Sequence, residues 1–363
     1  MLALGKELVI RGVQHRIETT DAEGYSARLG ASQRESLRWS GVPVCLHRFQ
    51  RPRRLKTSLG LARHVWALAK EVDVIHVHGL YLFSFVAAVL SARLRRVPYL
   101  VQPHGGLEPY HQNKSQKRKV LWDKLIGRWG LKGAYALVCA SESEAASIAR
   151  AGYENTVVIP HGVVRDLAQA SVNVQRRIDT WGDGAVVLFL GRLAKKKHPD
   201  VLIRAWSLRE RRGARLVFVG PDDDWTASEL MELAGSLGCG DSVECIGELV
   251  GGDKWAVLVR ATLFGLPSES ENFGIAVPEA LSAGTPCLLT DSVASSADVL
   301  AAGAGWVLSA LDADAWDEAL TQALSNSDIL DGMSRAALQH SSRRYAWKDV
   351  TDAYIALYEA AHT

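Results

Sequence analysis

The stretch LPSESENFGIAVPEALSAGTP, residues 266–286, decides how the second half of this chain is expected to fold. It begins at the end of the apolar run ATLFGL, passes through a short acidic turn, and continues as a helical pattern over residues 274–283. A strand that leads through a turn into a helix is one βα unit of a parallel sheet. Backbone amides at the start of such a helix favour an anion through the helix dipole. The stretch therefore predicts a strand, a turn and a helix whose first residues bind a phosphate.

Two glutamates in this stretch are candidate ligand-binding residues. Glu271 lies in the turn and Glu279 lies on the helix, so the two carboxylates are about two helical turns apart along the axis. Groups at that separation can hold a sugar near the turn and a ribose further along. The alternative is that Glu269, Glu271 and Glu279 form a solvated acidic face.

Similar βα units extend in both directions along the chain, and they fall into two series. The first contains the apolar runs at 15–20, 42–49, 72–79, 98–105, 136–141 and 155–162, and the second contains those at 185–191, 215–220, 242–247, 261–268 and 286–291. Helical patterns separate most of these runs, which indicates parallel sheets. Ligands of doubly wound sheets bind at the carboxyl ends of the strands.

The two series predict two domains, over residues 1–170 and 171–345, followed by a C-terminal helix at 346–363 that packs back on the first domain. The polar segment 165–184 is expected to be an irregular linker, and 316–340 has an amphipathic helical pattern. A length of 363 residues suits about two domains.

Charge is distributed unevenly between the halves. The net charge is only +2. Residues 1–170 carry 25 Lys and Arg against 13 Asp and Glu (25 − 13 = +12), whereas residues 171–363 carry 17 against 27 (17 − 27 = −10). The basic half suits an anionic ligand or an anionic membrane surface. We expect no nucleic-acid partner.

Several classes of protein are disfavoured by absent signals. The five cysteines include no C-x-x-C pair, so we expect neither disulfides nor a zinc site. The longest apolar run, residues 79–92, is too short to cross a bilayer, and the N-terminus does not read as a signal peptide. The chain also has no G-x-G-x-x-G after a strand, no P-loop and no G-x-S-x-G. These absences disfavour an NAD enzyme, a P-loop kinase and an α/β-hydrolase, and a cytoplasmic location is the default.

The segments SESENFG and PEALSAGTP together resemble the signature of the retaining glycosyltransferases of family 4. The resemblance implies the GT-B fold, an α/β architecture of two facing Rossmann-like, doubly wound parallel-sheet domains with a cleft between them. It implies that Glu271 lies near the donor sugar, that Glu279 binds the nucleotide ribose, and that the backbone near Phe273 and Gly274 meets the diphosphate. It also implies chemistry without a metal or other cofactor.

The loop GRLAKKKHPDVLI, residues 191–203, supplies candidate cations. Arg192 and Lys197 match the family pattern of an arginine after the glycine and a lysine five residues later, and both can form charge-assisted hydrogen bonds to one diphosphate. Lys195 and Lys196 match nothing and are expected to be solvated. The alternative is that the whole loop is an exposed basic segment.

In the first half, QPHGGLEP (102–109) resembles a family stretch in which His104 lies beside the donor sugar. A ring N–H there can hold a sugar hydroxyl or steady a developing charge. His76 and His78, in the run HVHG, are expected on opposite faces of a strand, with one facing the cleft. A ligand contact by His161 is doubtful, because the family more often has asparagine at that position. Two groups of basic residues are expected either to meet lipid headgroups or to be solvated: Arg51, Arg53, Arg54 and Lys56, and Lys114, Lys117, Arg118 and Lys119.

The resemblance implies a retaining glycosyltransferase that moves a sugar from a nucleoside diphosphate sugar to an acceptor hydroxyl. The acceptor is expected to be a glycan or a lipid-linked precursor, with peripheral contact at the inner face of a membrane. Two alternatives stay open: a nucleotide-sugar-binding protein of the same fold that has lost turnover, and a GT-B nucleotide-sugar epimerase.

The beginning of the chain departs from the family pattern. Family members start with a strand and a glycine-containing loop, but residues 2–12 already read as the first helix and HRIETT (15–20) as the second strand. The first strand, central in a sheet of order 3-2-1-4-5-6, is therefore expected to be absent. Its neighbours would then carry unpaired backbone groups, so we expect that Met1 is not the natural start or that the chain is a weakly active truncation.

Overall fold

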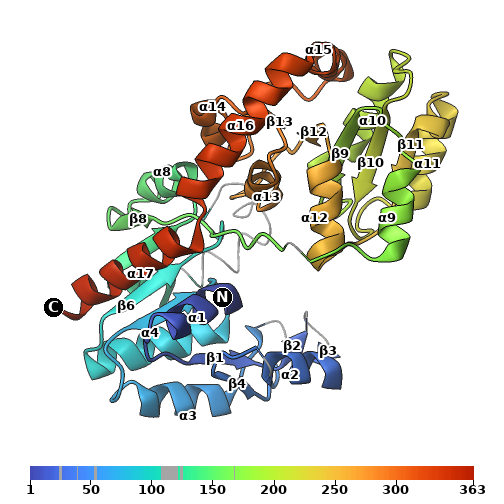
Figure 1. The fold of residues 1–363 in the computed structure, drawn as a ribbon. Coiled ribbons are helices and arrows are strands. Elements are labelled where there is room, and N and C mark those ends of the chain that lie inside the picture. The colour runs from blue at the N-terminus through green and yellow to red at the C-terminus, as the bar shows by residue number, and fades with distance from the viewer. Residues whose placement is uncertain (24–26, 39, 53–54, 108–121, 123–125, 167) are drawn as a thin grey trace. The chain divides into compact units, whose positions relative to one another are not determined.

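The computed structural model describes residues 1–23, 27–38, 40–52, 55–107, 122, 126–166 and 168–363. The chain forms two compact units (Figure 1). The first contains Met1–Gly162 and Trp347–Thr363, and the second contains Val163–Ala346. The chain therefore passes between the units twice, at 162–163 and at 346–347.

The second unit is built on one six-stranded parallel sheet of order β11-β10-β9-β12-β13-β14. Its strands are β9 (Val186–Leu190), β10 (Arg215–Val219), β11 (Val243–Cys245), β12 (Leu263–Leu266), β13 (Cys287–Thr290) and β14 (Gly305–Leu308). All five residues of β9 are buried, as expected for a central strand that is covered on both faces. The order is that of a doubly wound Rossmann sheet.

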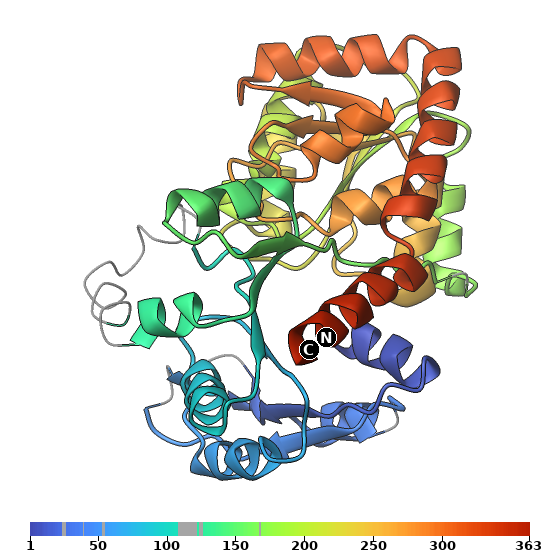
Figure 2. The ribbon, with the colours of Figure 1, turned by 90° about the vertical axis from the view of Figure 1, so that its left-hand side faces the viewer.

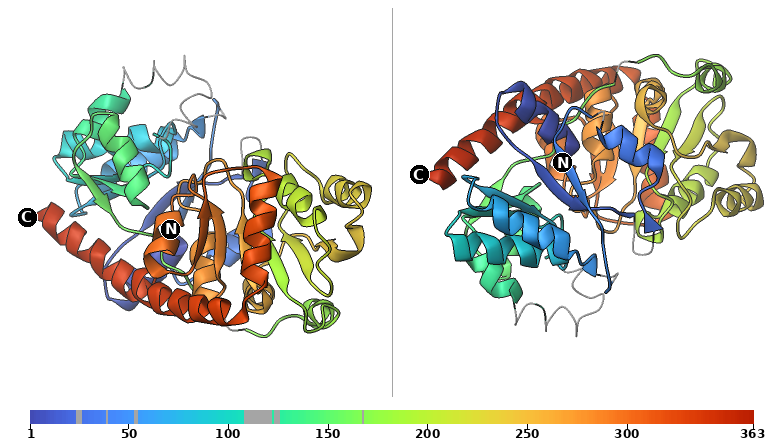
Figure 3. Two further views of the ribbon diagram at one scale, coloured as in Figure 1. Left: turned by 90° about the horizontal axis from the view of Figure 1, so that it is seen from above. Right: turned by 90° about the horizontal axis from the view of Figure 1, so that it is seen from below.

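Helices flank this sheet (Figure 3). One group packs together as α10 (Pro199–Ser207), α11 (Ala227–Ser236) and α15 (Ala313–Leu324). A second group contains α9 (Val172–Asp179), α12 (Gly251–Arg260), α13 (Ala276–Ala283), α14 (Ser296–Ala302) and α16 (Ser327–Arg344).

One expectation for this unit was wrong. The segment 165–184 is not entirely irregular, because Ser171 caps α9 by accepting a hydrogen bond from the Val174 amide and Ile178 anchors the helix in the core. The amphipathic pattern at 316–340 is helical, as predicted, and it is divided between α15 and α16, because Asn326 begins α16 as its N-cap.

The first unit contains two separate parallel sheets. The strands β1 (Ile17–Thr20) and β4 (Val44–His47) form one, and the other has the order β5 (Ile75–His78), β6 (Tyr99–Gln102), β7 (Ala136–Cys139) and β8 (Thr156–Val158). A short antiparallel pair joins β2 (Ala22–Glu23) to β3 (Ala27–Arg28). Among the described residues β1 is not hydrogen-bonded to β5. Each of these strands therefore has a neighbouring strand on one side only, β4 for β1 and β6 for β5.

The helices of the first unit pack against these sheets. They are α1 (Leu2–Ile10), α2 (Ala31–Arg38), α3 (Leu59–Leu68), α4 (Phe83–Arg95), α7 (Arg128–Lys132), α8 (Glu142–Arg150) and α17 (Trp347–His362). Leu4 and Leu8 of α1 share a core cluster with Val350 and Tyr354 of α17, and the two helices lie side by side (Figure 2). The helix predicted at the start of the chain is therefore present.

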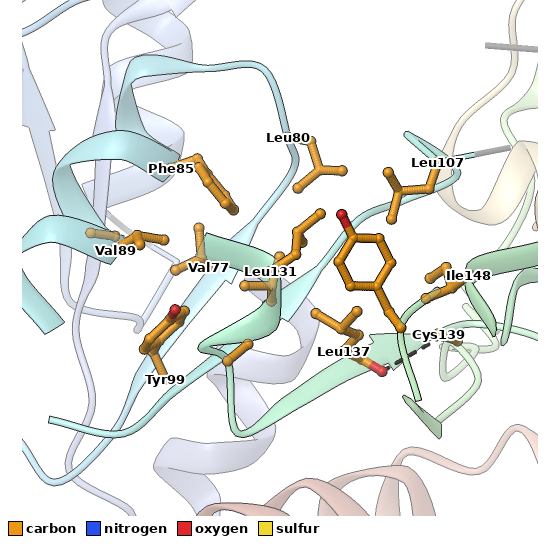
Figure 4. Packing of buried hydrophobic residues seen from close by; sticks show 14 of the residues in the cluster. Val77, Leu80, Phe85, Val89, Tyr99, Leu107, Leu131, Leu137, Cys139 and Ile148 are labelled. Atoms are coloured by element: carbon orange, nitrogen blue, oxygen red, sulfur yellow. Dashed lines mark hydrogen bonds between the residues drawn. The ribbon is translucent and has the colours of Figure 1, made fainter. Parts of the chain in front are cut away.

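The main core of this unit lies between the four-stranded sheet and its helices. Phe85 and Val89 of α4, Leu131 of α7 and Ile148 of α8 close over Leu137 and the neighbouring strand residues (Figure 4). No helix among the described residues combines the length and the apolar character needed to span a membrane.

Candidate functional site

The strand order of the second unit brings two predicted loops together. β9 and β12 are neighbours at the point where the strand order reverses, so residues 191–198 and 267–275 follow adjacent carboxyl ends. Crevices at such switch points are where doubly wound sheets bind ligands. Both loops carry the charged residues selected from the sequence.

Lys197 and Glu271 meet between these loops. The Lys197 ammonium lies 3.2 Å from Glu271 Oε1, and both side chains are largely buried. Gly191 makes this approach easier, because a Cβ at Gly191 would lie 2.8 Å from Lys197 Nζ and its φ of 148° disfavours other residues.

The two preceding lysines differ from each other. Lys195 is exposed as expected. Lys196 was wrongly expected to be solvated: its ammonium donates to the Ser270 carbonyl at 3.2 Å and lies 3.6 Å from Glu271 Oε1. The 3-10 turn Lys195–Lys197 turns these successive side chains in different directions.

Arg192 is the more exposed of the two predicted cations. Its guanidinium forms an ion pair with Asp223, which lies in the loop after β10, and 60% of the Arg192 side chain is accessible. The arginine is therefore available to a ligand but is held in place by a carboxylate.

Glu271 is positioned by the loop that follows β13. Its amide donates to the Ser292 carbonyl, and its carbonyl accepts from the Ala294 amide. These two backbone bonds join the turn from 267 to 275 to the next βα connection, and the Glu271 side chain points toward the lysines.

Phe273 and Gly274 lie between Glu271 and α13. The Phe273 ring is buried and meets Tyr345 edge to face, so only its backbone is suited to contact a ligand. Gly274 has a φ of 67°, the left-handed conformation that favours glycine, and it turns the chain into α13.

Glu279 lies on α13, as predicted, and is paired with a residue that the sequence analysis missed. The Lys254 ammonium on α12 donates to Glu279 Oε1 at 2.6 Å. Asp223 was missed in the same way. Neither residue lies in a recognised motif, although the acidic run at 222–224 directly follows a predicted strand.

His104 is the predicted site residue of the first unit. It follows β6 with a φ of 53°, and its Nε2 lies 3.1 Å from His78 Nδ1. The next amide, from Gly105, donates to the buried Glu144 carboxylate at 2.6 Å. Burial lowers the pKa of His104, so the ring is neutral at pH 7.

A cluster of histidines surrounds this position. The rings of His76 and His78 are 4.2 Å apart, so the expectation that they point to opposite faces was wrong. Side chains two positions apart in a strand share a face. His161 stacks on His104 at 5.8 Å between ring centroids. Burial lowers the pKa of His76 to about 3 and that of His161 to about 4.

Arg53, Arg54, Lys114, Lys117, Arg118 and Lys119 lie outside the described residues. Arg51 is exposed and Lys56 is partly buried.

Family models match both halves of the chain. Residues 1–162 match the glycosyl transferase 4-like domain, and residues 173–340 match the glycosyl transferases group 1. The two matches together span both units.

Curated relatives carry two kinds of name. A D-inositol 3-phosphate glycosyltransferase of Salinispora tropica is 32% identical over 202 residues, which is 52% of this chain and 42% of the relative. A GDP-mannose:cellobiosyl-diphosphopolyprenol alpha-mannosyltransferase of Komagataeibacter xylinus is 25% identical over 328 residues, covering 88% of this chain and 78% of the relative. The match thus spans less than half the length of the first relative.

Solved structures share the fold. HepE of Anabaena in complex with UDP and glucose has a TM-score of 0.76 at 19% identity, covering 96% of this chain and all of that one. WaaG, a glycosyltransferase involved in lipopolysaccharide biosynthesis, has a TM-score of 0.66 at 16% identity, covering 97% and 94%. These likenesses confirm the predicted α/β, GT-B fold class.

Proposed function

Because the chain belongs to the glycosyl transferases of group 1, we propose that it moves a sugar from a nucleoside diphosphate sugar to an acceptor hydroxyl with retention at the anomeric carbon. The observation that carries this proposal is the placement of Lys197, Arg192 and Glu271 around the ends of β9 and β12. An anion bound there would meet two cations and the start of a helix.

The diphosphate is the part of the donor that this arrangement suits. Arg192 offers a planar fork and Lys197 a point charge, and each can replace its carboxylate partner with a phosphate oxygen. The backbone at Phe273 and Gly274 then supplies N–H groups at the start of α13. These groups stabilise the leaving diphosphate in place of a divalent cation.

In this reaction no protein side chain forms a covalent bond to the sugar. The acceptor oxygen attacks the anomeric carbon from the side on which the diphosphate departs, the bond from that carbon to the diphosphate oxygen breaks, and the hydroxyl proton moves to the departing phosphate. Glu271 orients the donor sugar hydroxyls, and His104, neutral at pH 7, holds a sugar hydroxyl. Glu279 binds the ribose while Lys254 positions its carboxylate.

The proposed donors follow from the names of similar proteins. HepE of Anabaena was solved with UDP and glucose, and the Komagataeibacter relative is named for GDP-mannose. Uridine and guanosine diphosphate sugars are therefore the first to test. That relative is also named for a lipid-linked saccharide, which supports a glycan or lipid-linked acceptor.

A thermal-shift screen of UDP, GDP and ADP sugars, followed by a transfer assay that reads the product anomer by NMR, tests this function. Stabilisation by one donor and a product with the donor's anomeric configuration are expected. Donor binding without transfer or hydrolysis would favour the binding-protein alternative, and conversion of the donor without any acceptor would favour an epimerase. An inverted anomer would overturn retention.

Peripheral contact of the first unit with an anionic membrane is part of the same proposal. Leu94 on α4 is 67% exposed, and Arg93 and Arg95 lie over the rings of Trp129 and Trp66. Apolar side chains beside guanidinium groups suit the headgroup region.

Co-sedimentation with vesicles that contain phosphatidylglycerol tests this contact. We expect the wild type to bind, Leu94→Glu to bind less, and Leu338→Glu, at an exposed leucine of the second unit, to bind as the wild type does. Equal binding by both variants would exclude this surface.

A further inference from the structure

Four potential metal ligands of the first unit gather on one face of the β1–β4 sheet. Glu18 of β1 is the register partner of Cys45 on β4. His47 lies two positions after Cys45, so it shares that face. His64 comes from α3, which packs against β1.

The ligand atoms of these four residues lie close together. One oxygen, Glu18 Oε2, lies 2.5 Å from His47 Nε2 and 2.9 Å from His64 Nδ1. Cys45 Sγ lies 3.9 Å from the same His64 nitrogen. Each residue offers one atom within 4.8 Å of the other three. In a tetrahedral zinc site neighbouring ligand atoms are about 3.3–3.8 Å apart, so small side-chain shifts suffice.

The chemistry of this set selects one class of ion. Two imidazoles, a thiol and a carboxylate suit Zn²⁺, whereas Mg²⁺ and Ca²⁺ prefer oxygen ligands. We infer that Glu18, Cys45, His47 and His64 form a tetrahedral zinc site that links β1 and β4 to α3. On binding, the Cys45 S–H bond breaks, the proton leaves to solvent, and the thiolate binds the ion.

A simpler account is that Glu18 only accepts hydrogen bonds from the two histidines. That account leaves the other carboxylate oxygen, Glu18 Oε1, buried and without a hydrogen bond, with the Arg16 guanidinium 3.7 Å away. The Cys45 thiol, a weak hydrogen-bond donor, then interacts only weakly with Glu18 and with His64 Nδ1 at 3.9 Å. A bound cation would compensate the carboxylate charge and use all four groups.

The proposed zinc site stabilises the first unit rather than taking part in the sugar-transfer reaction. A two-stranded sheet is marginally stable by itself, and β1 and β4 pair only with each other among the described strands. A zinc ion joining both strands to α3 would stabilise that part of the first unit. The expectation of no zinc site rested on cysteine spacing, which cannot detect ligands from three separate elements.

Metal analysis of the full, tag-free chain tests the inference. After equilibrium dialysis against Zn²⁺, the wild type should retain about one zinc ion per chain. Loading with Co²⁺ instead should give a thiolate-to-cobalt charge-transfer band and the intense visible bands of tetrahedral cobalt. Zinc should also raise the melting temperature, and a chelator should reverse the rise.

Two variants and two controls make the result specific. Cys45→Ser should lose the charge-transfer band, and His64→Gln, at a partly exposed position, should weaken zinc binding at least about tenfold. Cys239→Ser and His362→Gln, which alter residues outside the cluster, should behave as the wild type does. Circular dichroism of the metal-free variants checks that they fold. Retention of much less than one zinc ion by the wild type, or an unchanged cobalt spectrum in Cys45→Ser, would overturn the site.

Discussion

The Lys197 ammonium lies 3.2 Å from Glu271 Oε1, and this pair joins the loops after two adjacent strands. Arg192 with Asp223 and Lys254 with Glu279 repeat the arrangement nearby. Each cation proposed to meet the donor diphosphate is therefore already held by a carboxylate. Donor binding would exchange Asp223 and Glu271 for phosphate oxygens rather than order free side chains, while Lys254 stays paired with Glu279.

Glu271→Gln should separate binding from transfer. The substitution removes the charge that competes for Lys197, so the affinity for the free nucleoside diphosphate should stay the same or rise. Transfer should fall, because the carboxylate no longer orients the donor sugar. Calorimetry and steady-state kinetics measure the two effects. Wild-type transfer in this variant would show that Glu271 belongs to a surface face only.

Glu279→Gln should weaken nucleotide binding, because a ribose contact is made with or without the sugar. The loss should be about 1.5–3 kcal/mol for a hydrogen bond to a charged group. Lys254→Met should give a smaller loss, since it leaves the carboxylate in place but removes its positioning partner. Calorimetric titration with the free nucleoside diphosphate compares them, and equal affinity of all three proteins would contradict the ribose assignment.

Gly191→Ala tests whether Lys197 must lie where it does. The added Cβ would fall 2.8 Å from Lys197 Nζ and displace the ammonium, and the backbone at φ 148° would be strained. We expect weaker nucleotide binding with the charge retained, together with about 1–2 kcal/mol lower stability. Gly235→Ala, where a Cβ meets nothing within 4 Å, is the control. Unchanged affinity in Gly191→Ala would mean that the position of Lys197 is unimportant.

The buried histidines predict acid sensitivity. Burial lowers the pKa of His161 from 6.5 in the unfolded chain to about 4. Between these values the unfolded chain holds more protons, so the free energy of unfolding is fully present above about pH 6.5 and falls with decreasing pH. The slope from this one group is up to about 1.4 kcal/mol per pH unit.

Denaturant unfolding from about pH 7 down to about pH 5 measures this slope. His161→Asn should reduce it, whereas His362→Asn, at an exposed position, should leave it unchanged. The same slope in His161→Asn as in the wild type would contradict the assignment.

The fold class was predictable because the buried strands of both series are continuous apolar runs, each followed by turn residues. The strand β14 was not recognised, since Gly305–Leu308 is half-buried at a sheet edge and lacks that signal. The loops that carry Arg192, Lys197 and Glu271 were located from their place after strands. Asp223 and Lys254 were not, because their partners come from other elements and only the tertiary structure brings them together.

The zinc ligands show the same limit. Glu18, Cys45, His47 and His64 are ordinary residues of two strands and a helix, and no local spacing marks them. The roles of His104, Glu271 and Glu279 in catalysis and donor binding stay predictions.

The central claim is that Lys197 is one of the cations that hold the donor diphosphate, and one titration tests it most directly. The nucleoside diphosphate selected by the thermal-shift screen is titrated calorimetrically into the wild type, Lys197→Met and Lys195→Met. The account predicts a loss of about 1.5–3 kcal/mol, or about 10- to 150-fold in affinity, for Lys197→Met and little change for Lys195→Met. Equal losses in the two variants would contradict it and show that the loop acts only through its overall charge.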